Sequence, residues 1–324
     1  MSNVLAELQL RRPDTVTAAL EYFAAAESAR YLAGGTDLIV NLRKGLEEPD
    51  TLIDLTGIEE LGGLTWSDPG LRIGAGVKIA DLTTNDQISE RYPAIAQAAR
   101  MIAGPTHRES ATVGGNLCLD TRCIYYNQSQ WWRQANDFCL KRDGDTCHVA
   151  PTGNKCRAAF SGDLAPALMV HGANIEIAGP DGRRRLRLDE LYIDDGADHL
   201  DLAAGEMVVA VWLPQARGRS AYDKVRTRAA IDFPLAGVAV AAHLTGGSLD
   251  AIRVAVTGAN SRPILIEGTD EFLGKPVDEA ALSKLNKLVQ KQVSPMRTTL
   301  ATGNYRRLAA AELAERLTAG LVGG

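Results

Sequence analysis

All five cysteines of this 324-residue chain lie between Cys118 and Cys156, and the rest of the sequence has none. Cysteines that merely fill a core would be scattered along the chain, so this clustering indicates one local thiol site. The segment from Met1 to Glu7 lacks the basic stretch and apolar core of a secretory signal, which predicts a cytoplasmic protein. Disulfides are disfavoured in that compartment, so metal binding is the favoured role of the thiols.

The last four cysteines are separated by 15, 7 and 8 residues and are the expected metal ligands: Cys123, Cys139, Cys147 and Cys156. Four thiolates are the usual ligands of a 4Fe-4S cluster or a structural zinc ion, and spacing alone does not separate the two. No Cys-x-x-Cys pair is present, so neither standard pattern is matched. Cys118 is taken as a non-ligand because it adjoins a glycine-rich segment, and His148 is a less favoured substitute ligand.

The composition, with 45% hydrophobic and 23% charged residues, is typical of a globular protein. The length predicts two or three packed units, which is enough to enclose a large cofactor. A net charge of -5 argues against nucleic-acid binding. The longest apolar run, 235–244, is interrupted by Gly237 and His243 and is about half of the roughly 20 residues that a membrane span needs. No membrane association is therefore expected.

Hydrophobic spacing indicates mixed helices and strands. A helix is expected after Asp14 or Thr15, with its apolar face formed by Val16, Ala19, Leu20 and Phe23. A glycine-containing turn at 179–182 joins two alternating segments and predicts a β-hairpin. Further strands are expected at 31–33, 51–55, 71–75, 235–242 and 252–256, and further helices at 38–44, at 93–103 and from 278 onward.

Two glycine pairs follow apolar segments: Gly34-Gly35 within 32–38 and Gly114-Gly115 within 111–117. Consecutive glycines let backbone N–H groups point into one concave site, which suits a pyrophosphate. Taken alone, either pair is also compatible with an ordinary tight turn. Neither pair matches the Gly-x-Gly-x-x-Gly pattern, so a Rossmann-type dinucleotide site is not indicated.

Several short motifs occur in one order over nearly the whole chain: Leu-Ala-Gly-Gly-Thr-Asp-Leu at 32–38, Gly-Ala-Gly-Val at 74–77, Ala-Thr-Val-Gly-Gly-Asn-Leu at 111–117, Ser-Gly-Asp-Leu at 161–164, Tyr-Asp-Lys at 222–224 and Asn-Tyr-Arg-Arg at 304–307. With these motifs the chain resembles the FAD-binding subunits of the xanthine dehydrogenase family and the medium chains of carbon monoxide dehydrogenases. The resemblance implies an α+β protein with the PCMH-type FAD-binding fold, in which two α/β subdomains hold FAD, and a C-terminal domain of antiparallel sheet plus helices.

The implied domains are an FAD-binding domain over 1–220, carrying an iron-sulfur loop insertion at 119–160, and a C-terminal domain over 221–324. The resemblance implies FAD contacts from the two glycine segments and from two later motifs: Ala33, Gly34, Gly35, Thr36, Asp37, Thr112, Gly114, Gly115, Asn116, Asp163 and Lys224. A cation such as Lys224 near the flavin would stabilise negative charge on the reduced ring. Without the family context, Lys224 is also compatible with a surface position.

Typical relatives run almost directly from the second glycine pair to the motif at 161–164, and a four-cysteine insertion resembles the 4-hydroxybenzoyl-CoA reductase branch of the family. This implies a 4Fe-4S cluster beside FAD, since zinc has no redox chemistry. Electrons would pass from reduced ferredoxin through the cluster and FAD toward a 2Fe-2S small subunit and a molybdenum-cofactor large subunit. The implied assembly is a dimer of heterotrimers that reductively dehydroxylates 4-hydroxybenzoyl-CoA to benzoyl-CoA during anaerobic degradation of aromatic compounds.

No catalytic acid, base or nucleophile is expected on this chain, because its histidines form no sequence-local set. Three alternatives stay open: an FAD subunit of the xanthine or carbon monoxide dehydrogenase type with structural zinc in the insertion, a standalone NADPH-dependent FAD reductase of the UDP-acetylmuramate type, and a scaffold without cofactor. The aromatic residues of the insertion, including Trp131 and Trp132, are expected either to keep water from the metal or to pack a loop that lacks a core.

Overall fold

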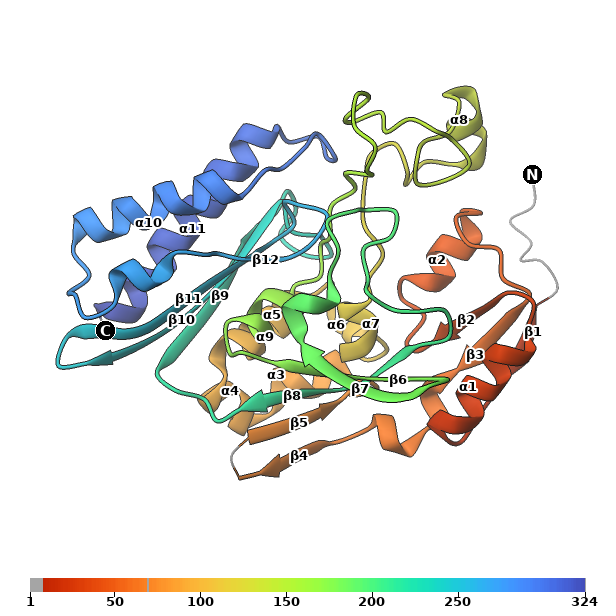
Figure 1. The fold of residues 1–324 in the computed structure, drawn as a ribbon, viewed down its shortest axis with the longest axis horizontal. Coiled ribbons are helices and arrows are strands. Elements are labelled where there is room, and N and C mark those ends of the chain that lie inside the picture. Colours follow the sequence, from red (N-terminus) through yellow and green to blue (C-terminus); the bar gives the residue numbers. More distant parts are fainter. Residues whose placement is uncertain (1–7, 69, 324) are drawn as a thin grey trace.

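In a computed structural model of the protein, residues 8–68 and 70–323 are described, and they form three β-sheets with surrounding helices. Figure 1 shows the N-terminal unit, a central unit with a larger sheet, and a C-terminal unit covered by two long helices. This combination confirms the predicted α+β class. The segment 1–7, from which the absence of a secretory signal is predicted, lies outside the described residues.

The N-terminal unit is a parallel sheet in the order β1-β3-β2, formed by β1 (Gln9–Arg11), β2 (Ala29–Leu32) and β3 (Thr51–Asp54). Parallel strands need a crossover connection, and α1 (Val16–Ala25) and α2 (Leu38–Arg43) provide the two that this sheet requires. Thr15 caps α1, accepting a hydrogen bond from the N–H of Ala18 at 3.1 Å, which confirms the expected helix start. The first glycine pair therefore lies just beyond the carboxyl end of β2.

The central unit is an antiparallel sheet in the order β4-β5-β8-β6-β7. Its strands are β4 (Leu64–Ser67), β5 (Gly70–Gly74), β6 (Asn174–Gly179), β7 (Gly182–Arg187) and β8 (Met207–Pro214). The predicted hairpin is confirmed as β6 and β7. The middle strand β8 is absent from the sequence prediction, because residues 207–211 are all buried and apolar and give no alternation.

Short helices pack against the central sheet and against one another: α3 (Ile79–Thr84), α4 (Asp86–Arg91), α5 (Pro93–Met101), α6 (Pro105–Arg108), α7 (Val113–Leu117) and α9 (Leu164–Met169). Buried residues of α5, including Ile95, join Ile73 of β5 and Ile177 of β6 in one hydrophobic core. Apolar burial on this scale is the main stabilising contribution to a fold of this size. It fixes α7 and α9, which carry the second glycine pair and the motif at 161–164.

The C-terminal unit is an antiparallel sheet in the order β12-β11-β10-β9, formed by β9 (Arg219–Val225), β10 (Ala236–Thr245), β11 (Ser248–Thr257) and β12 (Ile264–Leu265). The helices α10 (Glu279–Gln292) and α11 (Gly303–Val322) cover one face of this sheet (Figure 1). The implied domain boundary after residue 220 falls inside β9. None of the described helices is long and apolar enough to cross a membrane.

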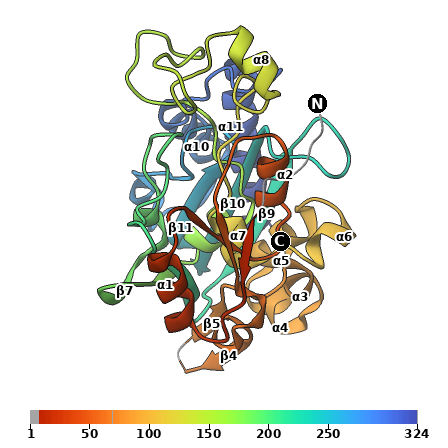
Figure 2. The ribbon, with the colours of Figure 1, turned by 90° about the vertical axis from the view of Figure 1, so that its right-hand side faces the viewer.

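The segment 123–158, hereafter the insertion, leaves the body of the molecule through a narrow stem. Two backbone hydrogen bonds of 2.7 and 2.8 Å between Arg122 and Ala159 close the stem. Beyond it the chain forms loops and one short helix, α8 (Gln130–Ala135), which project from the rest of the fold in both views (Figures 1 and 2). The insertion therefore leaves and rejoins the body of the molecule at one place.

Candidate functional site

The first glycine segment is an open turn between β2 and α2. Gly34 lies against the backbone just before α7. A Cβ on Gly34 would be 1.9 Å from the carbonyl oxygen of Ser110. Gly35 has a φ of +70°, in the left-handed region that favours glycine. In the described part of the chain, the N–H groups of Gly35, Thr36 and Asp37 donate to no protein acceptor. Unpaired amides in a glycine turn suit an anion such as a pyrophosphate.

The second glycine segment is the capped start of α7, which differs from the free turn that the sequence suggests. Thr112 accepts a hydrogen bond from the N–H of Gly115 at 3.1 Å, and the N–H of Gly114 donates to the carbonyl of Ala75 at 2.8 Å. A Cβ on Gly114 would lie 2.9 Å from the Cβ of Ala75, whereas at Gly115 it would meet only the Thr112 hydroxyl at 3.1 Å. The amides of Gly114 and Gly115 are thus already paired, so the first segment offers the freer set.

Asp163 and Lys224, which lie far apart in the sequence, form one buried ion pair, with Lys224 Nζ 2.9 Å from Asp163 Oδ1. Tyr222 donates to the same carboxylate at 2.6 Å, and Lys224 also donates to the carbonyl of Asp232 at 3.0 Å. The Lys224 side chain is fully buried, so the alternative of a surface lysine is wrong. Burial raises the pKa of Asp163, and the charge of Lys224 opposes that rise. Nearby, Asn116 accepts from the first residue of α9 at 3.1 Å.

The stem of the insertion is joined to the first glycine segment by charge. The guanidinium of Arg122, the residue before Cys123, pairs with the carboxylate of Asp37. The N–H of Asp120 donates to the same carboxylate at 3.3 Å, and Arg122 lies over the ring of Phe233 at 5.0 Å. Burial lowers the pKa of Arg122 to about 10, so it remains charged at neutral pH. One ion pair therefore connects the first glycine segment to the stem of the cysteine-bearing insertion.

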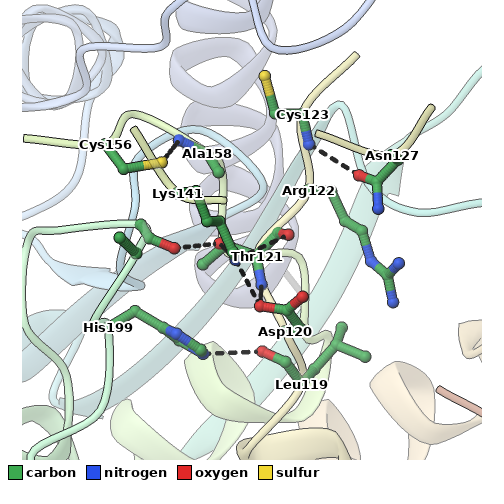
Figure 3. Close-up of polar contacts among 12 residues, drawn as sticks. Leu119, Asp120, Thr121, Arg122, Cys123, Asn127, Lys141, Cys156, Ala158 and His199 are labelled. Carbon is green, nitrogen blue, oxygen red and sulfur yellow. Dashed lines mark hydrogen bonds and ion pairs between the residues drawn. The ribbon is translucent and has the colours of Figure 1, made fainter. Parts of the chain in front are cut away.

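The four cysteines that the sequence selects line a single pocket in the insertion, together with aromatic and basic neighbours: Cys123, Cys139, Cys147, Cys156, Tyr125, Tyr126, Lys141 and His148. All four thiols are buried. Figure 3 shows Cys123 and Cys156 above the stem residues Thr121 and Arg122. Cys118 is not among the residues that line the pocket. Among the described residues, no group of three or more His, Cys, Asp or Glu side chains is arranged to hold a metal ion.

Two thiols of the pocket, Cys123 and Cys156, are held in their neutral form. Burial raises the pKa of Cys123 and raises that of Cys156 to about 12, and the neighbouring cysteines add to both shifts. Metal ligation requires the thiolate, so a metal bound in this pocket would have to displace protons from these thiols. Burial alone raises the pKa of Cys118 to about 12, and this thiol is therefore an unreactive core residue at neutral pH.

The aromatic residues of the insertion divide into two groups. Tyr125 and Tyr126 line the pocket, and Tyr125 stacks on His148 with 5.1 Å between ring centroids. The Nε2 atom of His148 is hydrogen-bonded to the carbonyl of Phe138, which holds the ring against Tyr125. Trp131 is 66% exposed, so the expectation that it packs or dries the pocket is wrong, whereas the two tyrosines do cover it.

Three buried cations near the pocket are missed by the sequence prediction: Lys141, Arg133 and Arg306. Arg133 donates to the carbonyls of Gln128 at 2.7 Å and Gly45 at 3.0 Å, and so fastens α8 to the end of α2. Arg306 donates to the hydroxyl of Thr298 at 2.9 Å beside the insertion. The acceptors come largely from distant segments, so no local pattern marks these residues. The only signal is the motif at 304–307, which contains Arg306.

Two family models match this chain and together cover most of its length. The family model described as the FAD binding domain in molybdopterin dehydrogenase matches residues 6–216, and that of the CO dehydrogenase flavoprotein C-terminal domain matches 220–320. The chain therefore belongs to the family of FAD-binding subunits of molybdopterin dehydrogenases. FAD is its cofactor, and it is an oxidoreductase subunit of the molybdenum hydroxylase type.

Individual relatives agree with that assignment. The aldehyde oxidoreductase FAD-binding subunit PaoB of Escherichia coli is 33% identical over 76% of this chain and 80% of its own length. The carbon monoxide dehydrogenase medium chain of Afipia carboxidovorans is 26% identical over 91% and 90%, respectively. A crystal structure of Cu,Mo-CO dehydrogenase superimposes with a TM-score of 0.81 at 23% identity over 99% of both chains, which shows the shared fold.

Proposed function

We propose that this chain is the electron-transfer subunit of a heteromeric molybdenum hydroxylase, with FAD on the two glycine segments and a 4Fe-4S cluster in the cysteine pocket. The observation that carries the proposal is the pocket of four buried cysteines, whose stem is ion-paired to the first glycine segment through Arg122 and Asp37. When bound, FAD supplies one- and two-electron chemistry and the cluster one-electron chemistry. The chain itself needs no acid or base for this role.

The two glycine segments are proposed to contact FAD in different ways, the first with free backbone N–H groups and the second with its backbone surface. The free N–H groups of Gly35 to Asp37 suit the pyrophosphate, and the close approach of Gly34 to Ser110 sets where that turn lies. Ala33 and Thr36 belong to the same turn. Thr112, Gly114, Gly115 and Asn116 are proposed to present the backbone surface of α7, since the N–H groups of this segment are largely committed.

Asp163 and Lys224 have a different proposed role from the one implied by the family resemblance. Because Asp163 neutralises the ammonium of Lys224 at 2.9 Å, the pair adds little net charge near the flavin. Instead, it ties the N-terminus of α9 to β9 and so fixes the central unit against the C-terminal sheet. Breaking a buried pair of this kind by removing one partner typically costs about 3–5 kcal/mol.

Four cysteines suit a cluster better than a zinc ion in this setting. The insertion leaves the fold beside the proposed flavin segment, where a redox centre can exchange electrons and a zinc ion cannot.

The partners and the direction of electron flow are also proposals. The relatives named above are subunits of aldehyde and carbon monoxide enzymes, which supports a complex of the oxidising type with a molybdenum-cofactor large subunit and a 2Fe-2S small subunit. They do not support the narrower 4-hydroxybenzoyl-CoA reductase assignment. Reduced ferredoxin as the donor, reductive dehydroxylation and a dimer of heterotrimers therefore remain predictions from the four-cysteine insertion alone.

The test is chemical analysis of the complex purified without oxygen. Iron, acid-labile sulfide, zinc and FAD are measured per copy of this chain, with the contribution of the 2Fe-2S subunit subtracted by using a Cys139→Ser complex as the matched control. We expect about four iron and four sulfide to be lost in the control, together with one EPR signal of the reduced enzyme. Loss of one zinc and no sulfide supports the structural-zinc alternative and contradicts the cluster.

A further inference from the structure

The stretch from residue 280 to residue 311 contains six lysine or arginine residues and no acidic residue, although the whole chain has a net charge of -5. It comprises most of α10, the start of α11 and residues 293–302 between them, hereafter the joining segment. The two helices cover one face of the C-terminal sheet (Figure 1). The proposed flavin segments and the cysteine pocket lie outside this stretch. Positive charge is therefore concentrated in one part of an acidic protein.

A groove of about 690 Å³ opens where the last turns of α10 meet the start of α11. Lys287 and Lys291 line it from α10, and Arg307 lines it from α11. Within residues 8–68 and 70–323, no acidic side chain lines this groove. Its volume is in the range of ligand-binding clefts. The charges that line the groove are therefore all positive, which suits a negatively charged occupant.

The cations of the groove lack counter-ions within the chain. Among the residues that the structure describes, Lys287 and Lys291 are exposed and form no ion pair. By contrast, Lys284, which lies one turn earlier on α10, pairs with Glu271 at 2.6 Å. The Nε atom of Arg307 is buried and has no hydrogen-bond partner. Like charges four residues apart destabilise a helix, so an anion bound between Lys287 and Lys291 would relieve their repulsion.

The start of α11 adds hydrogen-bond donors to the same groove. Thr302 caps the helix by accepting from the N–H of Tyr305 at 3.2 Å. In the described part of the molecule, the N–H groups of Gly303 and Asn304, two residues that line the groove, donate to no protein acceptor. A Cβ on Gly303 would lie 2.3 Å from the carbonyl oxygen of Pro295, so the helix start is pressed against the joining segment. Free N–H groups at the start of a long helix favour a negative charge, as the three cations do.

The other charged groups near the groove are already engaged. Arg306 is fully buried behind it and donates to the carbonyl of Met296 at 2.8 Å and to the hydroxyl of Thr298 at 2.9 Å. The carboxylate of Glu315 on α11 accepts from an α10 side chain at 2.7 Å. The carbonyl of Thr298 accepts from the N–H of Ile124 at 2.9 Å, which places the joining segment beside the insertion. Arg306 therefore holds the joining segment in place and leaves the binding of an anion to the lining cations.

Large apolar side chains are exposed in the same part of the chain. Leu300 of the joining segment is 95% exposed, Tyr305 is 49% exposed and Leu308 is 45% exposed. Tyr305 and Leu308 are three residues apart and so lie on one side of α11. Arg297 of the joining segment is also exposed. Exposed apolar residues close to cations are typical of a surface that contacts another protein, whereas a small inorganic anion needs no apolar contact.

We propose that the groove and the exposed apolar residues beside it dock an acidic segment of another protein. Carboxylates of that segment pair with Lys287, Lys291 and Arg307, and an apolar side chain of the segment covers Leu300 and Tyr305. Charge complementarity identifies the partner, because cations without counter-ions attract carboxylates during approach and fix where the segment lies. The proposal does not depend on which cofactors the chain holds. It places the partner beside the insertion.

The experiment measures the fluorescence anisotropy of a fluorescein-labelled peptide, Glu-Glu-Leu-Glu-Glu-Leu-Glu-Glu, with the full chain in about 10 mM salt, where charges are weakly screened. Lys287→Glu should weaken binding about tenfold. This change places a glutamate four residues before Lys291, which stabilises the helix, so unfolding would not explain the loss. Leu300→Ser should weaken binding about threefold, and it removes no packing because Leu300 is 95% exposed.

Arg217→Glu is the matched control, with the same change of charge at an exposed site. It lies near the far end of α11, since Arg219 donates to the carbonyl of Leu321 at 3.2 Å. Peptide affinity should equal that of the wild type in this variant. Equal affinities of Lys287→Glu and Arg217→Glu, or no binding by the wild type, would overturn the proposal.

Two further measurements decide between an acidic protein and other occupants. Inorganic tripolyphosphate is titrated against the peptide complex. If it displaces the peptide and Leu300→Ser binds the peptide as the wild type does, the groove is a site for small anions and the docking proposal is rejected. Sedimentation velocity gives the oligomeric state of the full chain. A dimer that is lost in Lys287→Glu would make a second copy of this chain the occupant and would also reject a separate acidic partner.

Discussion

The proposed flavin segments and the cysteine pocket are built in opposite ways. The proposed flavin site draws on stretches that are far apart in the sequence, 33–37, 112–116, 163 and 224, and it relies largely on backbone groups and close approach. The cysteine pocket comes from one excursion, 123–156, and relies on side chains. A backbone site is damaged by adding atoms, whereas a side-chain site is damaged by removing them. Substitutions in one region should therefore largely spare the other.

Cys139→Ser should distinguish the two regions most clearly, because it should change the iron content and not the FAD content. Serine is a poor ligand for iron, so the cluster should be lost completely, while the glycine segments are untouched and FAD should remain near its full occupancy. Iron and sulfide analysis beside flavin absorbance measures both in one preparation. Loss of FAD together with iron would show that the two sites depend on each other and would break the comparison.

The converse change is Gly34→Ala. The new Cβ would lie 1.9 Å from the Ser110 carbonyl, so the turn must move and most of the FAD should be lost. Overpacking of this kind costs about 1–3 kcal/mol of unfolding free energy. Gly320→Ala in α11 is the matched control, because a Cβ there would meet no neighbouring atom within 4 Å. Equal FAD content in the two variants would contradict the assigned importance of the first segment.

The pH dependence of stability tests the packing of His199, whose Nε2 is hydrogen-bonded to the carbonyl of Leu119 at 2.9 Å, next to the stem. Burial lowers the pKa of His199 to about 4, against 6.5 in the unfolded chain. Between those values the unfolded chain binds a proton that the native state does not, so stability should fall as the pH drops from 6.5 toward 4, and His199 should contribute about 1.4 kcal/mol per pH unit to that fall. Urea unfolding at several pH values measures the slope, and His199→Gln should make it shallower. If the unfolding free energy of the variant depended on pH as steeply as that of the wild type, His199 would not contribute to the loss of stability in acid.

A smaller effect is expected from Arg122→Gln, which tests the one ion pair between the two regions. Asp37 then loses its counter-ion, and because the pair is only partly buried the cost should be about 1–2 kcal/mol. If the pair couples the regions, FAD should bind roughly tenfold more weakly and iron should be retained. Fluorescence titration of flavin-depleted protein gives the affinity. An affinity equal to that of the wild type would mean that the ion pair is structural only.

Cys118→Ala should have the smallest effect. This thiol lies outside the pocket, and burial raises its pKa to about 12. Iron and FAD contents should match the wild type, with a loss of about 1 kcal/mol in unfolding free energy for the missing sulfur. Loss of iron would show that Cys118 is a ligand and that one of the other four is not.

Much of the fold follows from local chemistry. The start of α1 at Thr15, the hairpin of β6 and β7 and the start of α10 at Asp278 all match the patterns that predict them. Two features do not follow from a local pattern: the strand β8, and the helical conformation of the second glycine segment. Uninterrupted burial hides the alternation of a strand, and Thr112 becomes a helix cap only because Ala75 and Val77 bind the amides beside it.

By itself, the sequence determined which residues have the chemistry for each proposed site, because glycines permit close backbone approach and thiolates are the usual protein ligands of iron-sulfur clusters and structural zinc. Only the tertiary structure decided which charges face one another. Asp37 meets Arg122, Asp163 meets Lys224, and Lys141 reaches Asp120 across at least 20 residues of chain in each case. A buried charge must find a counter-ion, and that partner is supplied by packing of distant segments, which no local pattern records.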